Sequence, residues 1–427
     1  MIEPIQTSEA LVPGMDSGEL PPLRRMIDPD AALRLVLKSV TRHPPQRLPL
    51  HEICGLQLAE EIRADRDYPP FPRAMMDGYA VRVADAAATI EVVGEVAAGC
   101  IVKTPVREGC CLEIMTGAPC PPGTEAVVQK EHVRRSGSQV TLPKEIKPGC
   151  HIAPRGSECR GGVVVLRPGD TITPLATAVI ASTGLETVLV TRRPSLAVIT
   201  TGTELVSPGS EPAPGQIRDS NGPMLVAMVR DLRIEKPLHL HVSDSEDEIL
   251  QALNKVAKYD IVLLTGGVSV GNHDLVPRVL QDFGAEAVFY KVRQKPGKPL
   301  LMAKKGSQLL FGLPGNPLAC HLCFHRYVAA AIRLMEGKAP VLTPVSATLM
   351  AAVQPKKGKT YFLAARADRA DEASNSWRLH PLHGVSSADV FTSSKANCYA
   401  EVPPGCSEIP AGEVLLFTWI GAAPWPN

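Results

Sequence analysis

The chain has 427 residues, of which 44% are apolar and 4% aromatic, and its formal net charge at pH 7 is +1. This length predicts about three domains with substantial cores. The balanced charge and the few aromatic side chains argue against a globally basic nucleic-acid binder and against a stacking platform for single strands. An anionic substrate would therefore need a locally assembled basic pocket.

Targeting and redox features point to a cytoplasmic protein. The first 20 residues show no basic start followed by a long apolar run, as a secretory signal would. No segment approaches the ~18 uninterrupted apolar residues of a membrane span. The eleven cysteines are odd in number and scattered, which does not indicate a disulfide framework. We expect no membrane and no nucleic-acid partner.

The first part of the chain predicts a helical and β domain with an insertion. Residues 1–20 lack periodicity and predict a disordered tail. Asp28 offers a capping oxygen before Pro29, and apolar residues follow at helical spacing from Leu33. Residues 67–154 are short alternating runs broken by turns, typical of a small β domain. Residues 174–182 predict a helix that packs back on the first one. The elongated domain therefore comprises residues 21–66 and 155–192, and the β domain is inserted in it.

Residues 193–338 predict a central α/β domain. Apolar strands at 196–199, 239–242, 261–264 and 309–311 alternate with helices at 221–232, 246–256, 275–283 and 318–335. Such alternation favours a parallel-type sheet with helices on its faces, and ligands gather beyond the carboxyl ends of its strands. Residues 339–427 are again β-like, and we expect a C-terminal small barrel or sandwich.

Three glycine-containing loops follow predicted strands of this domain, at residues 200–204, 265–271 and 312–317. Glycines let the backbone approach a ligand, and none of the loops is a Walker motif. A basic run at residues 291–299 precedes the third loop. It is either a solvated strand edge protected by lysines or a grip for phosphate, in which Pro296 and Gly297 aim Lys295 and Lys298.

Other polar residues leave two interpretations open. Asp244 and Asp274 follow a predicted strand and a glycine loop, so they either bind Mg²⁺ or cap helices. Each alone favours capping. Cys320 and Cys323 lie three residues apart in a predicted helix without a second ligand pair, which indicates a shared buried face rather than a metal site.

Five motifs together carry a family resemblance. The chain resembles the molybdopterin molybdenumtransferases, the bacterial molybdenum insertases whose animal counterpart is the E domain of gephyrin, from about residue 22 onward. The motifs occur in the family's order, at residues 76–82 (Met-Asp-Gly-Tyr-Ala-Val-Arg), 115–119 (Met-Thr-Gly-Ala-Pro), 266–271 (Gly-Gly-Val-Ser-Val-Gly), 295–299 (Lys-Pro-Gly-Lys-Pro) and 312–317 (Gly-Leu-Pro-Gly-Asn-Pro).

The resemblance implies a multidomain fold with an inserted β domain, a molybdopterin-binding α/β domain and a C-terminal β-barrel. It implies a homodimer that transfers molybdate to adenylated molybdopterin, with Mg²⁺-dependent release of AMP. The upstream adenylyltransferase and the recipient molybdoenzymes are its implied further partners.

Site residues follow from the resemblance by matching each motif. Asp77 and Thr116 would reach the partner subunit's site, and Asp244 and Asp274 would handle Mg²⁺. The remaining implied catalytic residues are Glu204, Lys295 and Lys298, with Asp274 among them as well. The implied pterin- and molybdate-binding residues are Asp219, Ser220, Asn221, Gly266, Gly267, Ser269, Gly271, Pro314, Gly315, Asn316, Pro317, Arg366 and Ser387.

The chain departs from the family pattern at three places. Ala74 and Met75 replace a Ser-Ala pair, Thr203 replaces a carboxylate, and Glu158 stands where the family has Asp. Two other functions compete with the insertase. An adenylyltransferase would share the α/β domain alone. A non-catalytic scaffold would need a partner-binding surface, and the sequence shows no exposed linker or coiled coil that indicates one.

Overall fold

The computed structural model describes residues 26–267, 275–355, 358–370 and 376–421. The predicted tail and three predicted site residues, Ser269, Gly271 and Asp274, lie outside them. The described residues fall into two compact units, one within Met1–Pro44 and Arg192–Asn427 and the other within Pro45–Thr191. Among the described residues, no helix combines the length and apolarity that crossing a membrane requires.

The first unit contains a six-stranded sheet. Its order is β16 (Leu238–Val242), β13 (Leu196–Thr201), β17 (Ile261–Thr265), β21 (Gln308–Leu313), β20 (Leu301–Lys305) and β18 (Glu286–Tyr290). The first four strands are parallel, as predicted, and β13 and β17 are buried throughout, as strands covered on both faces must be. The strands β20 and β18 were not predicted and run antiparallel to their neighbours.

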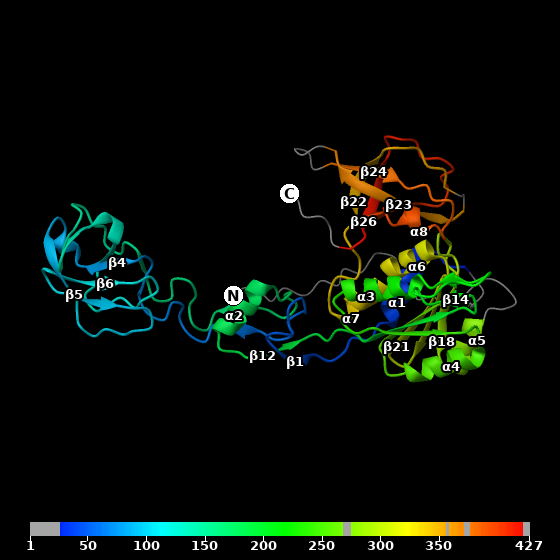
Figure 1. The fold of residues 1–427 in the computed structure, drawn as a ribbon, viewed down its shortest axis with the longest axis horizontal. Coiled ribbons are helices and arrows are strands. Elements are labelled where there is room, and N and C mark those ends of the chain that lie inside the picture. Colours follow the sequence, from blue (N-terminus) through cyan, green and yellow to red (C-terminus); the bar gives the residue numbers. More distant parts are fainter. Residues whose placement is uncertain (1–25, 268–274, 356–357, 371–375, 422–427) are drawn as a thin grey trace, which may run out of the picture. The chain divides into compact units, whose positions relative to one another are not determined.

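Helices cover both faces of this sheet, and Figure 1 shows the two layers. Alternate residues of each strand face opposite layers, so Val198 and Leu263 lie in one core while Ile199 and Leu264 lie in the other. One layer comprises α4 (Glu246–Lys255) and α5 (Leu275–Asp282). The other comprises α1 (Pro29–Ser39), α3 (Asn221–Asp231), α6 (Pro317–Cys323), a π-helical turn (Phe324–Val328) and α7 (Ala329–Met335). Two short strands, β14 (Leu205–Val206) and β15 (Ile217–Arg218), pair beside the sheet.

The start of the first helix differs from the prediction in one detail. Helix α1 begins at Pro29 as expected, but the Asp28 side chain makes no capping hydrogen bond and instead pairs with Arg293 at 3.5 Å. Ala32 and Val36 are fully buried in the core of the α/β layer.

Cys320 and Cys323 are buried in that same core, as predicted for a structural pair. All eleven cysteines of the chain are free thiols.

A closed barrel forms the C-terminal part of the first unit, which confirms one of the two predicted alternatives. Its strands are β23 (Thr360–Arg369), β24 (Trp377–Pro381), β22 (Val345–Leu349), β26 (Val414–Trp419) and β25 (Cys398–Val402), and β25 pairs back to β23. A short helix, α8 (Val390–Ser393), precedes β25. The two-residue strand β19 (Gln294–Lys295) pairs with β23, so the barrel sheet extends to the basic run of the α/β domain.

The second unit contains the inserted β domain. Its six-stranded sheet has the order β7 (Ala126–Gln129), β4 (Gly78–Val81), β6 (Cys110–Ile114), β5 (Thr89–Val96), β9 (Gln139–Thr141) and β8 (Arg134–Ser136). Short 3₁₀ turns cover Val83–Asp85 and Lys130–His132. The remainder consists of α2 (Pro174–Ser182) and three two-stranded ladders, β1 (Gln46–Pro49) with β12 (Thr187–Val190), β2 (Ile62–Arg63) with β11 (Val164–Leu166), and β3 (Arg73–Ala74) with β10 (Ile152–Ala153).

Asp260 anchors both segments at which the chain leaves and re-enters the first unit. One carboxylate oxygen lies 2.8 Å from Arg192 and 3.1 Å from His43, and the other accepts a 2.7 Å hydrogen bond from the Ser195 amide. Burial alone would raise the pKa of Asp260, but the Ser195 hydrogen bonds and the Arg192 charge hold it below its ordinary value. The carboxylate is therefore ionised and fully paired.

Asp260→Ala is expected to lower the free energy of unfolding by about 3 kcal/mol, because it leaves Arg192 half-buried without its partner. Urea unfolding at neutral pH measures this loss. Asp282→Ala, an exposed substitution at the end of α5, is the matched control and should change stability by less than about 0.5 kcal/mol. Equal effects of the two substitutions would contradict the anchoring role.

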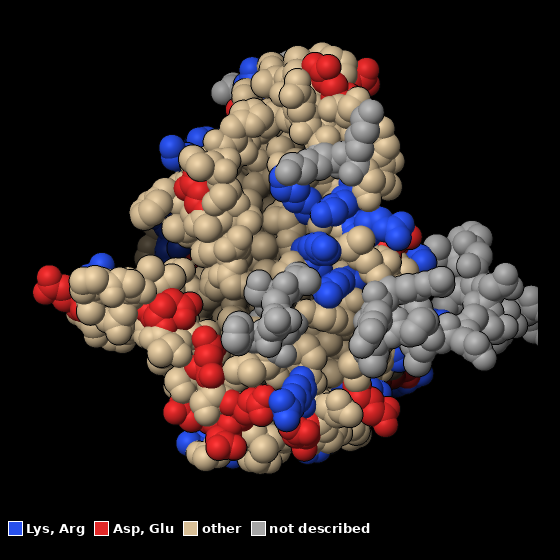
Figure 2. Space-filling view, turned by 90° about the vertical axis from the view of Figure 1, so that its right-hand side faces the viewer, with Lys and Arg blue, Asp and Glu red and all other residues tan. Residues whose placement is uncertain are grey.

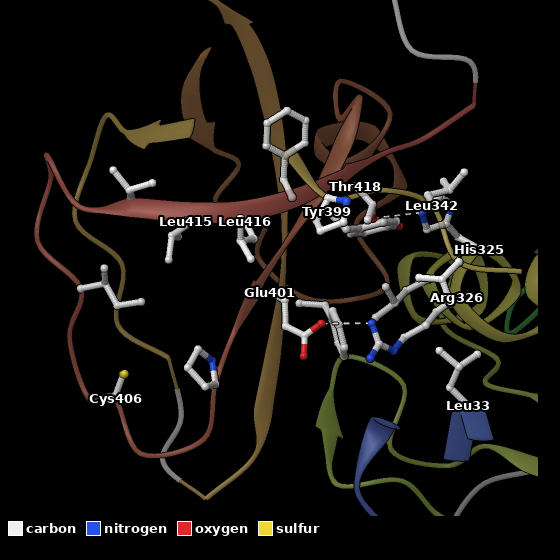
Figure 3. Close-up of a pocket in the computed structure, with 18 of the residues that line it drawn as sticks. Leu33, His325, Arg326, Leu342, Tyr399, Glu401, Cys406, Leu415, Leu416 and Thr418 are labelled. Atoms are coloured by element: carbon white, nitrogen blue, oxygen red, sulfur yellow. Dashed lines mark hydrogen bonds and ion pairs between the residues drawn. The ribbon is translucent and has the colours of Figure 1, made fainter. Parts of the chain in front are cut away.

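Two histidines, one on α6 and one on the π-helical turn, join these helices to the barrel. His321 Nδ1 lies 2.8 Å from the Tyr399 hydroxyl, and His325 Nε2 lies 3.3 Å from Thr418 Oγ1. Figure 3 shows His325 beside Thr418 and Tyr399. Burial lowers the pKa of His321 to about 4, and burial together with nearby positive charge lowers that of His325 to about 3. Both rings are therefore neutral at physiological pH.

Acidification is expected to weaken this contact. Below about pH 6.5 the unfolded chain protonates both rings while the folded chain does not, so stability falls as pH drops toward about 4. Each histidine contributes a slope of up to about 1.4 kcal/mol per pH unit. Urea unfolding followed by fluorescence of the barrel residues Trp377 and Trp419 measures it. The His321→Gln, His325→Gln double variant should flatten the dependence, whereas exposed His51→Gln should not; an unchanged slope in the double variant would contradict the assignment.

Candidate active site

The three predicted glycine loops lie together at one edge of the α/β sheet. Thr200 pairs with Thr265 across β13 and β17, and Thr265 pairs with Leu313 across β17 and β21. The parallel register therefore aligns the carboxyl ends of these strands, and residues 200–204, 265–267 and 312–317 emerge side by side. This is the position at which open α/β sheets bind ligands.

A pocket of about 530 Å³ opens at this edge, a size typical of small-molecule sites. Three lysines and one carboxylate supply its charge, since Lys295, Lys298, Lys359 and Glu204 all line it. The rest of the wall consists of Gly266, Gly267, Gln294, Pro296, Gly297, Pro299, Pro314, Gly315, Asn316, Ala319 and Ser387. Figure 2 shows lysine and arginine side chains gathered in the middle of one face of the molecule, with acidic side chains gathered below them.

The lysine turn, residues 295–298 (Lys-Pro-Gly-Lys), forms one wall of the pocket. Its Lys295–Pro296 peptide bond is cis, and Gly297 has φ +90°. A Cβ atom on Gly297 would lie 2.7 Å from both Cys323 Sγ and Gln294 Nε2, so only glycine fits there. The turn therefore packs closely against α6 while its lysines line the pocket.

The second glycine loop passes close to the first. Gly266 has φ +100°, and a Cβ atom on it would lie 1.9 Å from the Thr201 carbonyl oxygen. The Thr201 hydroxyl in turn donates a hydrogen bond to Asp244. Asp244 does not cap a helix: Ser245 caps α4, accepting from the Glu248 amide. The Asp244 carboxylate instead lies beside the second glycine loop, near Gly267.

Asp219 and Asn221 hold the loops together. Asp219 is buried and accepts hydrogen bonds from the Thr200 hydroxyl and the Gly222 amide, each at 2.9 Å. Burial favours its neutral form, but these hydrogen bonds and nearby His239 lower its pKa. Asn221 donates to Thr265 Oγ1 at 3.0 Å and to the Gly315 carbonyl at 2.7 Å, while its Oδ1 has no partner among the described residues.

The barrel contributes Ser387 directly to the pocket. Ser387 Oγ accepts a 2.8 Å hydrogen bond from Asn316 Nδ2, and its carbonyl oxygen accepts one from the Leu318 amide at 3.1 Å. Pro317 is the first residue of α6. Arg366 is exposed on β23, opposite His380, and is not among the residues lining the pocket; nor is exposed Ser220, just before α3.

Asp77 and Thr116 meet in the inserted β domain of the second unit. Asp77 Oδ1 accepts hydrogen bonds from the Thr116 hydroxyl at 2.6 Å and the Thr116 amide at 2.7 Å, and Lys130 lies 3.6 Å from Oδ2. The Thr116 hydrogen bonds lower the pKa of Asp77, so its carboxylate is ionised. Glu158, one of the departures, pairs with Arg73 at 2.6 Å.

Sequence reasoning missed Lys359 as a pocket residue. Lys359 precedes β23 in the run Lys356-Lys357-Gly358-Lys359, and the only sequence signal was that local basic cluster. Its position depends on the pairing of Gln294 with Thr360, which joins the barrel to the lysine turn. Single-sequence patterns do not reveal such a long-range pairing.

A larger cavity of about 690 Å³ lies between the helices and the outer face of the barrel. The positive charge of Arg326, which lines this cavity, is already neutralised, because the guanidinium pairs with Asp30 at 2.6 Å and with Glu401 at 3.0 Å. Figure 3 shows Arg326 pointing toward Glu401. An anionic substrate fits the lysine-lined pocket better.

Comparison with known proteins identifies the family to which the chain belongs. Residues 27–184 match the MoeA N-terminal region (domain I and II), residues 197–334 a probable molybdopterin binding domain, and residues 346–418 the MoeA C-terminal region (domain IV). The molybdopterin molybdenumtransferase of Staphylococcus epidermidis is 32% identical over 401 residues, covering 92% of this chain and 95% of that protein. The chain belongs to the MoeA family of molybdopterin molybdenumtransferases.

Solved structures agree with this assignment. The molybdopterin biosynthesis MoeA protein of Pyrococcus horikoshii is 28% identical and superimposes with a TM-score of 0.72 over 93% of this chain and all of that one. A molybdenum cofactor biosynthesis protein of Pyrococcus furiosus, 19% identical with a TM-score of 0.56 over 93% of this chain and all of that one, shares the fold. The resemblance drawn from the five motifs, and the multidomain fold that it implied, are therefore confirmed.

Proposed function

We propose that this MoeA family member transfers molybdate to adenylated molybdopterin and releases AMP, giving molybdenum cofactor. In this reaction the phosphoanhydride link of the substrate is cleaved and the dithiolene sulfurs take up the metal. The observation that carries the proposal is the pocket at the carboxyl edge of the α/β sheet, where three lysines converge beside two glycine loops. Phosphate and molybdate are both multiply charged oxyanions, and fixed ammonium groups in a pocket stabilise such charge.

Lys295 and Lys298 are proposed to bind the oxyanions, with Lys359 added from the barrel side. Lysine is a compact point charge, suited to tetrahedral anions that approach from several directions. Glu204, which also lines the pocket, is proposed as the acidic catalytic residue, and Gly266, Gly267, Pro314 and Gly315 as the backbone wall for the pterin. Ser387, which lines the pocket, remains a proposed molybdate-side residue; Arg366 lies outside this lining and is proposed from the family resemblance alone.

Magnesium is the proposed cofactor, and Asp244 has the right donor chemistry for it. Mg²⁺ is commonly bound by one or two carboxylates, with substrate phosphates and water completing its octahedron. The described residues contain no cluster of three or more His, Cys, Asp or Glu able to hold a metal. Asp244, oriented by Thr201, therefore fits a site of the substrate-completed kind. Bound there, the ion would neutralise charge on the phosphates.

A homodimer is proposed, in which Asp77 and Thr116 of each subunit serve the site of the other. Two surface features of the second unit support association with another copy. Helix α2 exposes Leu175 (80%) and Val179 (38%), and the loop before Asp77 exposes Met75 (53%). Apolar groups exposed in this way are common at interfaces between subunits.

The proposed location is the cytoplasm, where eleven free thiols would stay reduced. The upstream adenylyltransferase and the recipient molybdoenzymes are proposed as transient partners.

AMP release from adenylated molybdopterin, with Mg²⁺ and in the presence or absence of molybdate, tests the proposal. A parallel reaction with ATP and free molybdopterin separates the insertase from an adenylyltransferase. The insertase releases AMP from adenylated molybdopterin when molybdate is present and does not consume ATP. An adenylyltransferase consumes ATP in the reaction with free molybdopterin. Consumption of ATP without release of AMP would overturn the proposal.

A further inference from the structure

A buried hydrogen-bond network lies directly behind the lysine turn. Gln294, fully buried, precedes the turn, and its Nε2 donates to the carbonyl oxygens of Pro296 at 3.1 Å and Gly297 at 3.3 Å. Its Oε1 accepts a 2.5 Å hydrogen bond from the Tyr327 hydroxyl. The side-chain amide of Gln294 therefore hydrogen-bonds to the two central residues of the turn from its buried side, and the Tyr327 hydroxyl orients that amide.

The π-helical turn explains how Tyr327 reaches this position. Residues of a regular helix repeat every 3.6 positions, and the wider turn over Phe324–Val328 changes the direction of the side chains that follow. Tyr327 and Cys323 are both fully buried, and the thiol of Cys323 lies 3.6 Å from Gln294 Nε2. Local departures of this kind occur frequently at functional sites.

The backbone at Gln294 also pairs with the barrel. Gln294 pairs with Thr360 and Lys295 with Tyr361, and the Thr360 amide donates to the Arg293 carbonyl at 3.1 Å. Lys359 immediately precedes Thr360 and lines the pocket. The backbone of the segment that contains Gln294 thus places Lys359 beside the lysine turn.

We propose that Gln294, oriented by Tyr327, is a positioning residue for oxyanion capture, because its side chain fixes the lysine turn and so the geometry of Lys295 and Lys298 around the bound anion. This inference rests on the proposed function of the pocket. Its side chain does not need to touch the substrate. An apolar residue of similar size would fill the same space and leave the two carbonyl oxygens of the turn without their donor.

Gln308 provides a matched control within the same domain. It is also a buried glutamine, and its Nε2 donates to three backbone carbonyls, those of Val256, Ala257 and Tyr259, at 3.1, 3.3 and 2.7 Å. It stands at the first residue of β21, at the opposite end of the strand from the pocket. Replacing it removes the same kind of interaction without changing the lysine turn.

The test measures equilibrium binding of molybdate alone to the full-length protein by titration calorimetry. Gln294→Leu is expected to raise the Kd for molybdate about tenfold, since about 1.4 kcal/mol of preorganisation is lost. Tyr327→Phe, which retains the ring, should shift it by about threefold in the same direction. Gln308→Leu should leave the Kd within about twofold even though it lowers stability. In AMP release, the Gln294 variant should show a raised KM for molybdate with kcat nearly unchanged.

The possible outcomes distinguish failure of the positioning role of Gln294 from failure of the proposed function of the pocket. Wild-type protein that binds molybdate, while folded Gln294→Leu and Tyr327→Phe bind it equally well, would overturn the positioning role and leave the proposed function intact. Equal weakening by Gln294→Leu and Gln308→Leu would also overturn it, because the effect would then follow stability alone. Wild-type protein that fails to bind molybdate, with Lys298→Ala no different, would overturn the proposed function and this inference with it.

Discussion

Asp244→Asn is expected to reduce AMP release at least about 100-fold, because several kcal/mol of charge stabilisation at the phosphates depends on the bound Mg²⁺. The substitution is nearly isosteric, and the asparagine oxygen can still accept the hydrogen bond from Thr201. The protein should therefore remain folded. A higher Mg²⁺ concentration should restore part of the rate, since weaker binding of the ion is the cause.

Asp247→Asn is the control for this variant. Asp247 is an exposed residue of α4, three positions further along the chain, and its substitution should leave AMP release unchanged. The measurement is the initial rate of AMP release over a range of Mg²⁺ concentrations. Full activity of Asp244→Asn at low Mg²⁺ would remove this carboxylate from the metal site.

Asp77→Ala and Lys298→Ala are each expected to lose nearly all activity alone and to regain it when mixed. In a homodimer whose sites combine groups from both subunits, a mixed dimer carries both lesions at one site and none at the other. Random reassociation of equal amounts should restore about one quarter of wild-type AMP release. The measurement is activity after denaturation and joint refolding, compared with the separately refolded variants.

Asp77→Ala mixed with Thr116→Ala is the matched control. These residues share hydrogen bonds in the same β domain, so each mixed dimer would carry one lesion at each site. No recovery is expected. Recovery in this pair, or its absence in the pair of Asp77→Ala with Lys298→Ala, would contradict a site built from two subunits.

Much of the α/β domain could be predicted from the sequence because its signals are local. Apolar runs placed β13, β17 and β21 within two residues of their observed ends, and helical spacing after a proline start placed the beginning of α1 at Pro29. Glycines at the ends of strands then predicted the loops that line the pocket. Each of these features follows from burial and backbone conformation within a few residues.

What the sequence could not predict depends on contacts between distant segments. The strands β18 and β20 have ordinary amphipathic or apolar sequences whose antiparallel direction only the sheet decides. Helix α1 showed one apolar face, but periodicity does not say which surface covers it. Lys359 reaches the pocket through the pairing of β19 with β23, and Tyr327 reaches Gln294 through a π turn within an apparently regular helix.

The most direct test of the account is AMP release from adenylated molybdopterin by the wild-type protein in Mg²⁺, compared with and without molybdate. The lysine-lined pocket predicts release that depends on molybdate and saturates with it. Release that is equally fast without molybdate would contradict the insertase, as would no release from folded protein that still binds the pterin, which would instead indicate a carrier or scaffold.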